Sequence, residues 1–310
     1  MAQMTNEQPQ AWLDGRFVPA SEAKISIVDA GFVQGTAVAE QVRTFAGRLF
    51  HLEDHLARLQ RGLEIVGADP GLSAEQFAVL AEELVARNYR LLEAGDDLGL
   101  SIVVTPGQYA GYGGRPGRPT VCLHTYPLPF HLWAEKYRTG QSLVTTPVEQ
   151  VSPRSWPASL KCRSRMHYYL ADRQAERIEP GARAVLLDHE GKVTEASTAN
   201  VILYFRGMGL RIPPRSAVLQ GISLRVVEEL ASAMGIATEE EQFGPERIVQ
   251  ADEVFLSSTP FCLLPVSRFN GQAVSGGEPG PMFRRLLAAW SALVGVDIAE
   301  QARRFACRKA

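Results

Sequence analysis

The chain has 310 residues, which is more than one hydrophobic core usually organises, so its length predicts two domains. Its formal charge of -2 comes from 32 basic and 34 acidic side chains, and this balance gives no electrostatic reason to expect binding to nucleic acid or to an acidic membrane surface. No apolar run approaches the roughly 18 residues of a membrane span. The four cysteines are widely spaced and form no C-x-x-C pair, so we expect a cytoplasmic globular protein without a disulfide framework.

The first part of the chain predicts several strands and two helices. The leucines of His51–Val66 recur at steps of three and four residues, which is typical of a helix, and Gly67 is its expected end. A second helix is predicted from Ser73 to Leu92, because Ser73 and Gln76 have the spacing of a capping box. Strands are predicted at residues 11–17, 24–29, 38–45, 48–52, 98–105 and 120–126.

Pro127-Leu128-Pro129 is a break typical of a linker, and strands and helices begin again after it. A helix is predicted over residues 162–179, and another opens at Gly221 and ends at Gly235. Further strands are expected at 141–146, 182–188, 192–197, 200–205 and 254–257, with a last helix at 282–294. The elements mix without regular β-α-β alternation, so we predict an α/β protein of the α+β type with domains at 1–130 and 131–310.

Common cofactor and metal motifs are absent from the sequence. The glycine-rich loop after residue 106 fails as a dinucleotide-binding motif, because Pro116 stands where the third glycine is required and no helix follows. His51 and His55 are four residues apart on the predicted helix, but no carboxylate ligand is implied between them. We therefore predict no metal site.

Several motifs occur in an order that resembles class IV, fold-type IV, aminotransferases. The resemblance runs collinearly from about Trp12 to Val266, and the order of the motifs makes it specific. The motifs are V-D-A-G-F-V-Q-G from Val28, V-A-E-Q-V-R from Val38, G-R-L-F-H-L-E-D-H-L-A-R-L from Gly47, S-L-K from Ser159, T-E-A-S-T-A-N-V from Thr194, L-Q-G-I-S from Leu219 and S-S-T from Ser257.

The resemblance implies a two-domain enzyme that depends on pyridoxal 5'-phosphate (PLP), with a smaller N-terminal domain and a larger C-terminal sheet domain that holds the cofactor. Lys161 is similar to the family's catalytic lysine, whose amine forms a Schiff base and moves a proton. Glu195 resembles the carboxylate that keeps the pyridine nitrogen protonated, and alternation puts it on the same strand face as Val193. The phosphate group is expected to bind at Arg58, Ile222, Ser223, Ser258 and Thr259. Periodicity alone would put Arg58 on the solvated side of its helix, so its role is implied by the resemblance and not by the helix.

The residues expected around the substrate match the known members less well. The sequence has Glu40, as transaminases do, where the aminodeoxychorismate lyase branch carries a threonine. Ala39 replaces an aromatic residue, and Ser101 stands at the position of an arginine of the branched-chain enzymes. Met166 replaces the tyrosine that supports the cofactor's phenolate oxygen, and counting does not decide whether His167, Tyr168 or Phe32 takes that role. The candidate substrate-binding residues are Phe32, Gln34, Ala39, Ser101 and Arg115.

These features predict a transaminase that moves an amino group between an amino acid and a 2-oxo acid in two half-reactions. We expect branched-chain-type substrates. The alternatives are a D-amino acid or (R)-amine transaminase, aminodeoxychorismate lyase, and a catalytically idle relative. The resemblance also implies a homodimer, and three apolar residues near the linker are candidates for its interface: Phe130, Leu132 and Trp133.

Overall fold

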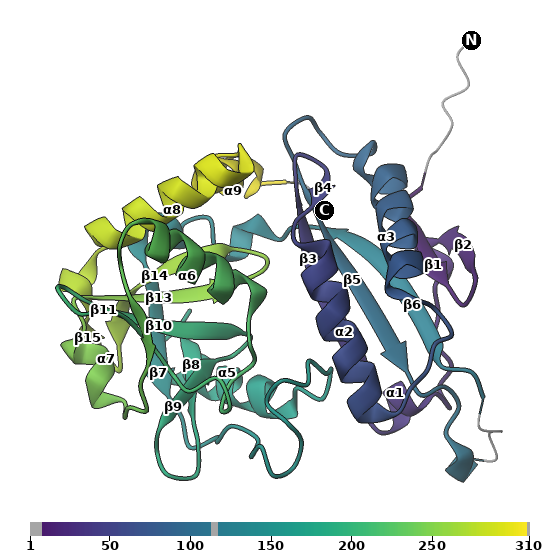
Figure 1. Cartoon of the computed structure of the whole chain (residues 1–310), viewed down its shortest axis with the longest axis horizontal. Helices are drawn as coiled ribbons and strands as arrows, with labels where there is room; N and C mark the ends of the chain where they lie inside the picture. Colours follow the sequence, from purple (N-terminus) through teal and green to yellow (C-terminus); the bar gives the residue numbers. More distant parts are fainter. Residues whose placement is uncertain (1–7, 113–116, 309–310) are drawn as a thin grey trace. The chain divides into compact units, whose positions relative to one another are not determined.

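The computed structural model describes residues 8–112 and 117–308, which form two compact units (Figure 1). The first unit is Met1–Leu128 together with Leu160–Ser164, and the second is Pro129–Ser159 together with Arg165–Ala310. The short segment Leu160–Ser164 therefore belongs by its contacts to the first unit, whereas the sequence placed it in the C-terminal domain. Its backbone pairs with a strand of the first unit, which is the physical reason for the difference.

The first unit contains a six-stranded sheet in the order β2-β1-β6-β5-β3-β4, with every neighbouring pair antiparallel among the described residues. The predicted strands at 38–45 and 98–105 are confirmed to the residue. The bounds are β1 (Gln10–Leu13), β2 (Arg16–Pro19), β3 (Val38–Phe45), β4 (Arg48–Leu49), β5 (Leu98–Thr105) and β6 (Thr120–Pro127).

The strand predicted at residues 24–29 was wrong. Asp29 instead caps the short helix α1 (Ala30–Val33), and its Oδ1 accepts a hydrogen bond of 2.7 Å from the backbone N–H of Gly31. Its Oδ2 accepts hydrogen bonds from the hydroxyls of Thr105 and Thr120. A short acidic side chain that competes in this way for local N–H groups favours a cap over a strand.

Helices α2 (Leu52–Val66) and α3 (Ala74–Tyr89) cover one face of this sheet (Figure 1). Both predicted ends are confirmed: Gly67 closes α2 with a φ of 72°, and Ser73 and Gln76 form the capping box of α3. The leucines of α2 pack against the alternate strand residues that face the helices, and each such side chain stabilises the fold by about 1.5–3 kcal/mol. The strand residues in this core are Val38, Val42, Leu100, Ile102, Val104, Val121 and Leu123.

The second unit contains a sheet in the order β12-β11-β10-β13-β14-β7-β8-β9, and β9 also pairs with β10. The strands from β10 round to β9 therefore form a closed ring, which leaves these strands without a free edge. The bounds are β7 (Gln141–Thr145), β8 (Arg183–Leu187), β9 (Val193–Ala196), β10 (Ala199–Phe205), β11 (Gly209–Ile212), β12 (Thr238–Glu240), β13 (Glu253–Ser258), β14 (Cys262–Phe269) and β15 (Gln272–Ala273), the last of which pairs with β14.

Helices of the second unit pack on this ring. Helix α5 lies against β7 and β8 through Ala171 and Ala175, and it begins at Met166, four residues later than predicted. The strands β11, β14 and the helix α9 were not predicted. The helices are α4 (Lys136–Thr139), α5 (Met166–Ile178), α6 (Ile222–Ala233), α7 (Glu246–Gln250), α8 (Pro281–Val294) and α9 (Ile298–Phe305).

Two of the three apolar residues proposed for an interface are buried in the second unit. Phe130 is 1% exposed and packs against Phe305, and Trp133 is 5% exposed and packs against Phe261. That prediction was wrong for these two, because Phe305 of helix α9 covers Phe130, and Phe261, just before β14, covers Trp133. Leu132 alone of the three is exposed.

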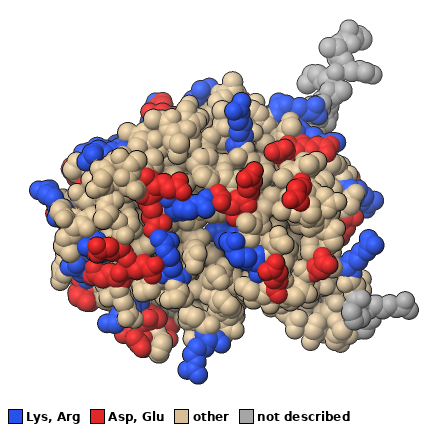
Figure 2. Space-filling view, viewed as in Figure 1, with Lys and Arg blue, Asp and Glu red and all other residues tan. Residues whose placement is uncertain are grey.

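Charged side chains of both signs are interspersed over the face of the molecule in Figure 2, in keeping with the formal charge of -2. Among the described residues, no helix combines the length and apolar character needed to cross a membrane.

Candidate active site

Lys161 lies on an extended segment beside β3, not at the start of a helix as predicted. The backbone oxygen of Lys161 accepts a hydrogen bond of 3.0 Å from the N–H of Ala39, and the N–H of Arg163 donates to the oxygen of Ala37 at 2.8 Å. Val38 and Cys162 form the antiparallel bridge between these two bonds. The catalytic-lysine candidate therefore stands on backbone that two hydrogen bonds fix to the beginning of β3.

The alternation of this segment decides where Lys161 points. Leu160 packs into the core beneath α2, where Gly62 leaves room for it and for Val38. Arg163 reaches the opposite face of the sheet, where its Nη2 donates to Ser101 Oγ at 2.8 Å. Because successive side chains of an extended chain alternate, we expect Lys161 to leave the backbone on the same face as Arg163.

Arg58, the predicted phosphate ligand, is buried in an ion pair with Glu40. Its Nε donates to Glu40 Oε1 at 2.7 Å and its Nη2 donates to Glu40 Oε2 at 2.8 Å, so the contact is bidentate. Periodicity alone assigned Arg58 to the solvated side of α2, but its side chain is only 6% exposed because Glu40 of β3 binds it. Together with His55, whose Nδ1 lies 2.8 Å from Glu40 Oε2, these residues form the Glu40 cluster.

The surroundings of the Glu40 cluster lower the pKa values of both Glu40 and His55. Burial by itself would raise the pKa of the Glu40 carboxyl, but the charge and hydrogen bonds of Arg58 outweigh it, with help from His55, and hold that pKa well below its ordinary value. Burial lowers the pKa of His55, opposed by Glu40 and reinforced by the charges of Arg58 and Lys161. His55 is therefore neutral at pH 7, and its Nδ1–H donates to an ionised Glu40.

The sheet face opposite the helices carries the predicted substrate residues Ala39 and Ser101, and both are fully buried. Strand register aligns Gln41, Ser101 and His124 in one row across β3, β5 and β6. The next row contains Ala39, Val103 and Cys122, so an apolar strip lies beside a polar one. Three other candidates are not on this face as described: Phe32 and Gln34 are exposed at and just after α1, and Arg115 lies outside the described residues.

In the second unit, Glu195 of β9 is buried and held by two neutral donors. Its Oε1 accepts a hydrogen bond of 2.6 Å from Gln150 Nε2 and another from the hydroxyl of Tyr168. Burial, followed by the charge of Glu195, raises the pKa of Tyr168 far above its ordinary value, so this phenol stays a donor. Val193, on the same face of the strand, is also buried, which excludes an exposed hairpin carboxylate.

Register connects Glu195 with the start of α6. Glu195 pairs with Asn200 of β10, and Asn200 pairs with Ser257 of β13. Asn200 Nδ2 donates to the oxygen of Leu219 at 2.8 Å, which holds the loop before α6. A Cβ on Gly221 would lie 2.1 Å from Asn200 Oδ1, so the close approach of this loop requires glycine.

The start of α6 and the end of β13 offer donors suited to an anion. No described side chain caps the first turn of α6, where Ile222 and the buried Ser223 stand. The N–H groups of such a turn bind phosphate well. At the end of β13, the buried Ser257 Oγ has no hydrogen-bond partner in the described structure and can donate to an anion, whereas Ser258 Oγ already donates its proton to the oxygen of Thr198 at 2.8 Å.

Comparison with known proteins decides the family. The model of the family described as amino-transferase class IV matches residues 37–269. The chain belongs to the class IV aminotransferases. A D-alanine aminotransferase of Bacillus licheniformis is 28% identical over 276 residues, which cover 89% of this chain and 94% of that protein.

Solved structures of aminotransferases have the same fold. The branched-chain amino acid aminotransferase from Escherichia coli superposes with a TM-score of 0.79 at 21% identity, over 93% of this chain and 94% of that one. The branched-chain aminotransferase of Thermoproteus uzoniensis with norvaline gives 0.78 at 26% identity, over 96% and 94%. The predicted fold type is thereby confirmed. The prediction of a PLP-dependent transferase is confirmed as well, because class IV aminotransferases use PLP and a further branched-chain enzyme of this fold was solved with pyridoxamine 5'-phosphate.

The residues of this aminotransferase fit the cofactor at several points. The uncapped turn of α6, the orphaned hydroxyl of Ser257 and the glycine required at position 221 make a cradle for a phosphate. A buried carboxylate held by neutral donors, as Glu195 is, fits a protonated pyridine nitrogen.

The sequence did not single out four residues that the structure brings to these sites: His55, Gln150, Arg163 and Tyr168. All four act through contacts that are distant in sequence or that depend on strand register. His55 had a signal, since it lies three residues before Arg58 on the same predicted helix, but from the sequence it was considered only for a metal pair with His51, and that pair was rejected. His51 binds Asp54 instead, and the described residues contain no cluster suited to a metal.

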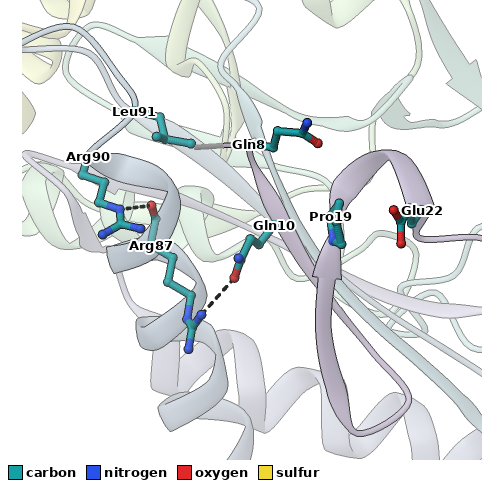
Figure 3. Close-up of a pocket in the computed structure, with 7 residues that line it drawn as sticks. All are labelled: Gln8, Gln10, Pro19, Glu22, Arg87, Arg90 and Leu91. Atoms are coloured by element: carbon teal, nitrogen blue, oxygen red, sulfur yellow. Dashed lines mark hydrogen bonds between the residues drawn. The ribbon is translucent and has the colours of Figure 1, made fainter. Parts of the chain in front are cut away.

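A cavity of about 470 Å³ beside the N-terminal hairpin holds none of the predicted site residues (Figure 3). Two arginines line it, but Arg87 donates to Gln10 at 3.0 Å and to Glu83 at 2.5 Å, and Arg90 donates to the oxygen of Arg87. The contacts of both arginines with neighbouring residues therefore account for their presence at this cavity by a role in the fold.

Proposed function

We propose that this aminotransferase moves an amino group between an amino acid and a 2-oxo acid in two half-reactions, with Lys161 as the catalytic amine. The observation that carries the proposal is the buried Glu195, held by Gln150 and Tyr168 in a form suited to a pyridinium. PLP, when bound, supplies an electron sink that acidifies the Cα–H bond of the amino acid.

The proposed roles of the residues follow from their chemistry. Lys161 holds the cofactor through Nζ and, once released by the substrate, moves the Cα proton at that same atom. Glu195 keeps the pyridine nitrogen protonated. The first N–H groups of α6 at Ile222 and Ser223, together with Ser258, Thr259 and Arg58, would hold the phosphate, and Glu40 fixes the guanidinium of Arg58 for this role.

Two variants with a matched control test this proposal. Lys161→Ala should abolish the visible absorbance of lysine-bound PLP, and Glu195→Gln should lower kcat by about 10²–10³-fold because an amide cannot neutralise the pyridinium. Glu190→Gln, at the exposed end of the same hairpin, should leave kcat unchanged. A wild-type protein that stays colourless with added PLP would overturn the proposal, and it would favour a catalytically idle relative.

For the substrate we propose branched-chain-type amino acids. The strip of Ala39, Val103 and Cys122 offers an apolar wall next to the polar row of Gln41, Ser101 and His124. D-Amino acids are the second candidate, because the relative in Bacillus licheniformis is named a D-alanine aminotransferase. Transamination of paired L- and D-amino acids, valine and leucine beside alanine, with 2-oxoglutarate and pyruvate as acceptors, separates the two.

Two other activities have simple tests. Pyruvate released from aminodeoxychorismate without an amino acceptor would select the lyase. Amino transfer from a primary amine that lacks a carboxylate would select an (R)-amine transaminase.

We also propose a homodimer in the cytoplasm. Met166, Tyr169 and Leu170 recur at helical spacing on α5 and are 68%, 57% and 44% exposed, which is unusual for a helix face that remains in water. Light scattering of the purified protein should give twice the mass of the chain, and Leu170→Glu should reduce it. The four cysteines form no disulfide in the structure, and the location itself stays a prediction.

A further inference from the structure

The guanidinium of Arg163 is built into the same sheet face as the proposed substrate wall. Its Nη2 donates to Ser101 Oγ at 2.8 Å, and Ser101 is fully buried in the middle of β5. The charge of Arg163 also reaches His124, where it adds to the effect of burial in lowering the histidine's pKa. A cation is thus held against the strand row that contains Ser101 and His124.

The backbone of Arg163 is fixed as firmly as its side chain. Its N–H donates to the oxygen of Ala37 at 2.8 Å, and the hydroxyl of the next residue, Ser164, donates to the oxygen of Gly35 at 2.7 Å. A guanidinium anchored at both ends loses little further freedom on binding a ligand, which favours recognition over a mobile surface contact.

The spacing between Arg163 and Lys161 relates this anchored charge to the proposed reacting amine. The two residues are two positions apart on extended chain, so their Cα atoms are separated by roughly 6.6 Å, and alternation predicts that their side chains leave the same face. In an amino acid, the carboxylate is attached to the carbon that carries the reacting nitrogen. A cation one side chain away from the lysine amine is therefore suitably placed for a substrate carboxylate.

We propose that Arg163 binds the carboxylate of the substrate and that Ser101 positions its guanidinium. This inference rests on the proposed function, because it takes Lys161 as the reacting amine. The planar fork of arginine binds a carboxylate through two parallel N–H bonds, and the hydroxyl of Ser101 orients that fork. Arg163 is then a specificity-determining residue that distinguishes acids from amines of the same shape.

Equilibrium binding to the PLP-loaded enzyme tests the proposal without turnover. The probes are 4-methylvalerate and its neutral amide, measured by calorimetry against wild type, Arg163→Ala, Arg163→Lys and Ser101→Ala. Wild type should bind the acid more tightly than the amide. Arg163→Ala should lower the affinity for the acid by roughly 10- to 100-fold, the loss expected for a charged hydrogen bond, and leave the affinity for the amide nearly unchanged.

The other variants separate recognition from support of the fold. Arg163→Lys keeps the charge but not the planar fork, so its affinity for the acid should lie between those of Arg163→Ala and the wild type. Ser101→Ala should lower the affinity for the acid less than Arg163→Ala does. Arg61→Ala, at an exposed position of α2, is the control and should change neither constant. Glutarate, which has two carboxylates, is a third probe and shows which carboxylate Arg163 binds. If Arg163→Ala loses affinity for both acids, Arg163 binds the carboxylate nearest the reacting carbon. If it loses affinity for glutarate alone, Arg163 binds the distal carboxylate.

Two results would overturn the proposal. One is equal affinity of the wild type for acid and amide. The other is an Arg163→Ala variant whose affinity for the acid and for the amide falls equally and whose thermal stability also falls, because loss of a purely structural arginine would have these effects. Visible absorbance and transamination by the wild type are measured separately, so failure of the proposed function would be recognised independently.

Discussion

Glu40 and Arg58 form a bidentate ion pair in which Arg58 Nε lies 2.7 Å from Glu40 Oε1, and neither side chain is more than 6% exposed. The pair joins a strand of the sheet to the helix that covers it. It also holds a guanidinium that the family resemblance assigns to the cofactor phosphate, so one contact serves both the fold and the proposed site.

Removal of the carboxylate charge should destabilise the protein strongly. We expect Glu40→Gln to lower the free energy of unfolding by about 3–5 kcal/mol, because it removes the negative charge to which the buried guanidinium of Arg58 is bound. Urea titration of the cofactor-free protein measures this. Glu64→Gln, on the exposed side of α2, is the matched control and should cost little.

The same variant also reports on the phosphate role of Arg58. Inorganic phosphate or PLP should raise the unfolding midpoint of Glu40→Gln more than that of the wild type, since the anion supplies the missing charge. Equal shifts in the two proteins would argue that Arg58 does not bind phosphate.

The stability of the protein should decrease in mild acid because of its buried histidines. Burial lowers the pKa of His55 below the ordinary value of 6.5, with smaller contributions from neighbouring cations, and the unfolded chain therefore binds a proton that the folded chain does not. Stability from this group is fully present above pH 6.5 and is lost as the pH falls toward the lowered pKa. His124 and His167, whose pKa values are also lowered by burial, contribute with the same sign.

Unfolding by urea at a series of pH values from 7.5 to 5 checks this expectation. His55→Gln should reduce the slope of stability against pH by up to about 1.4 kcal/mol per pH unit, the value for one proton. His189→Gln, at an exposed turn, should keep the wild-type slope. An unchanged slope in His55→Gln would show that this histidine is charged in the folded protein.

The sequence predicted local elements well and long-range contacts poorly. The strands at 38–45 and 98–105 and the capping box of α3 follow from alternation and spacing, which are local properties. Arg58 was placed in solvent by the same periodicity, because the pattern of α2 contains no information about Glu40, 18 residues earlier on the paired strand.

Arg163 illustrates the same limit at the substrate side. The resemblance showed a serine at position 101 in place of an arginine, but the guanidinium that reaches this serine comes from 62 residues further along the chain. That contact depends on the pairing of residues 161–163 with β3, whereas local pattern predicted a helix there. Tertiary pairing overrode local propensity at the segment that carries the candidate lysine.

Tyr168 should stabilise the protein through its bond to Glu195. Tyr168→Phe removes a donor from a buried carboxylate, so we expect the free energy of unfolding of the cofactor-free protein to fall by about 1.5–3 kcal/mol. The adjacent Tyr169→Phe is a matched control, because its hydroxyl is exposed and bonds only to Arg173 among the contacts that the structure describes. Equal stability of the two variants would mean that Glu195 does not depend on the hydroxyl of Tyr168.

Gly221 should be the position where a single methyl group most directly disturbs the cofactor phosphate. Its φ of -70° is open to any residue, so the effect of Gly221→Ala comes from the clash of the new Cβ with Asn200 Oδ1, 2.1 Å away, and not from backbone strain. The loop before α6 must then move, and with it the N–H groups of the first turn. We expect PLP affinity, measured by absorbance titration, to fall by roughly tenfold or more, and stability to fall by about 1–3 kcal/mol. The double variant Gly221→Ala with Asn200→Ala removes the atom that clashes. It should therefore bind PLP better than the sum of the two single losses predicts, and strict additivity of the losses would show that the two residues do not act through this contact.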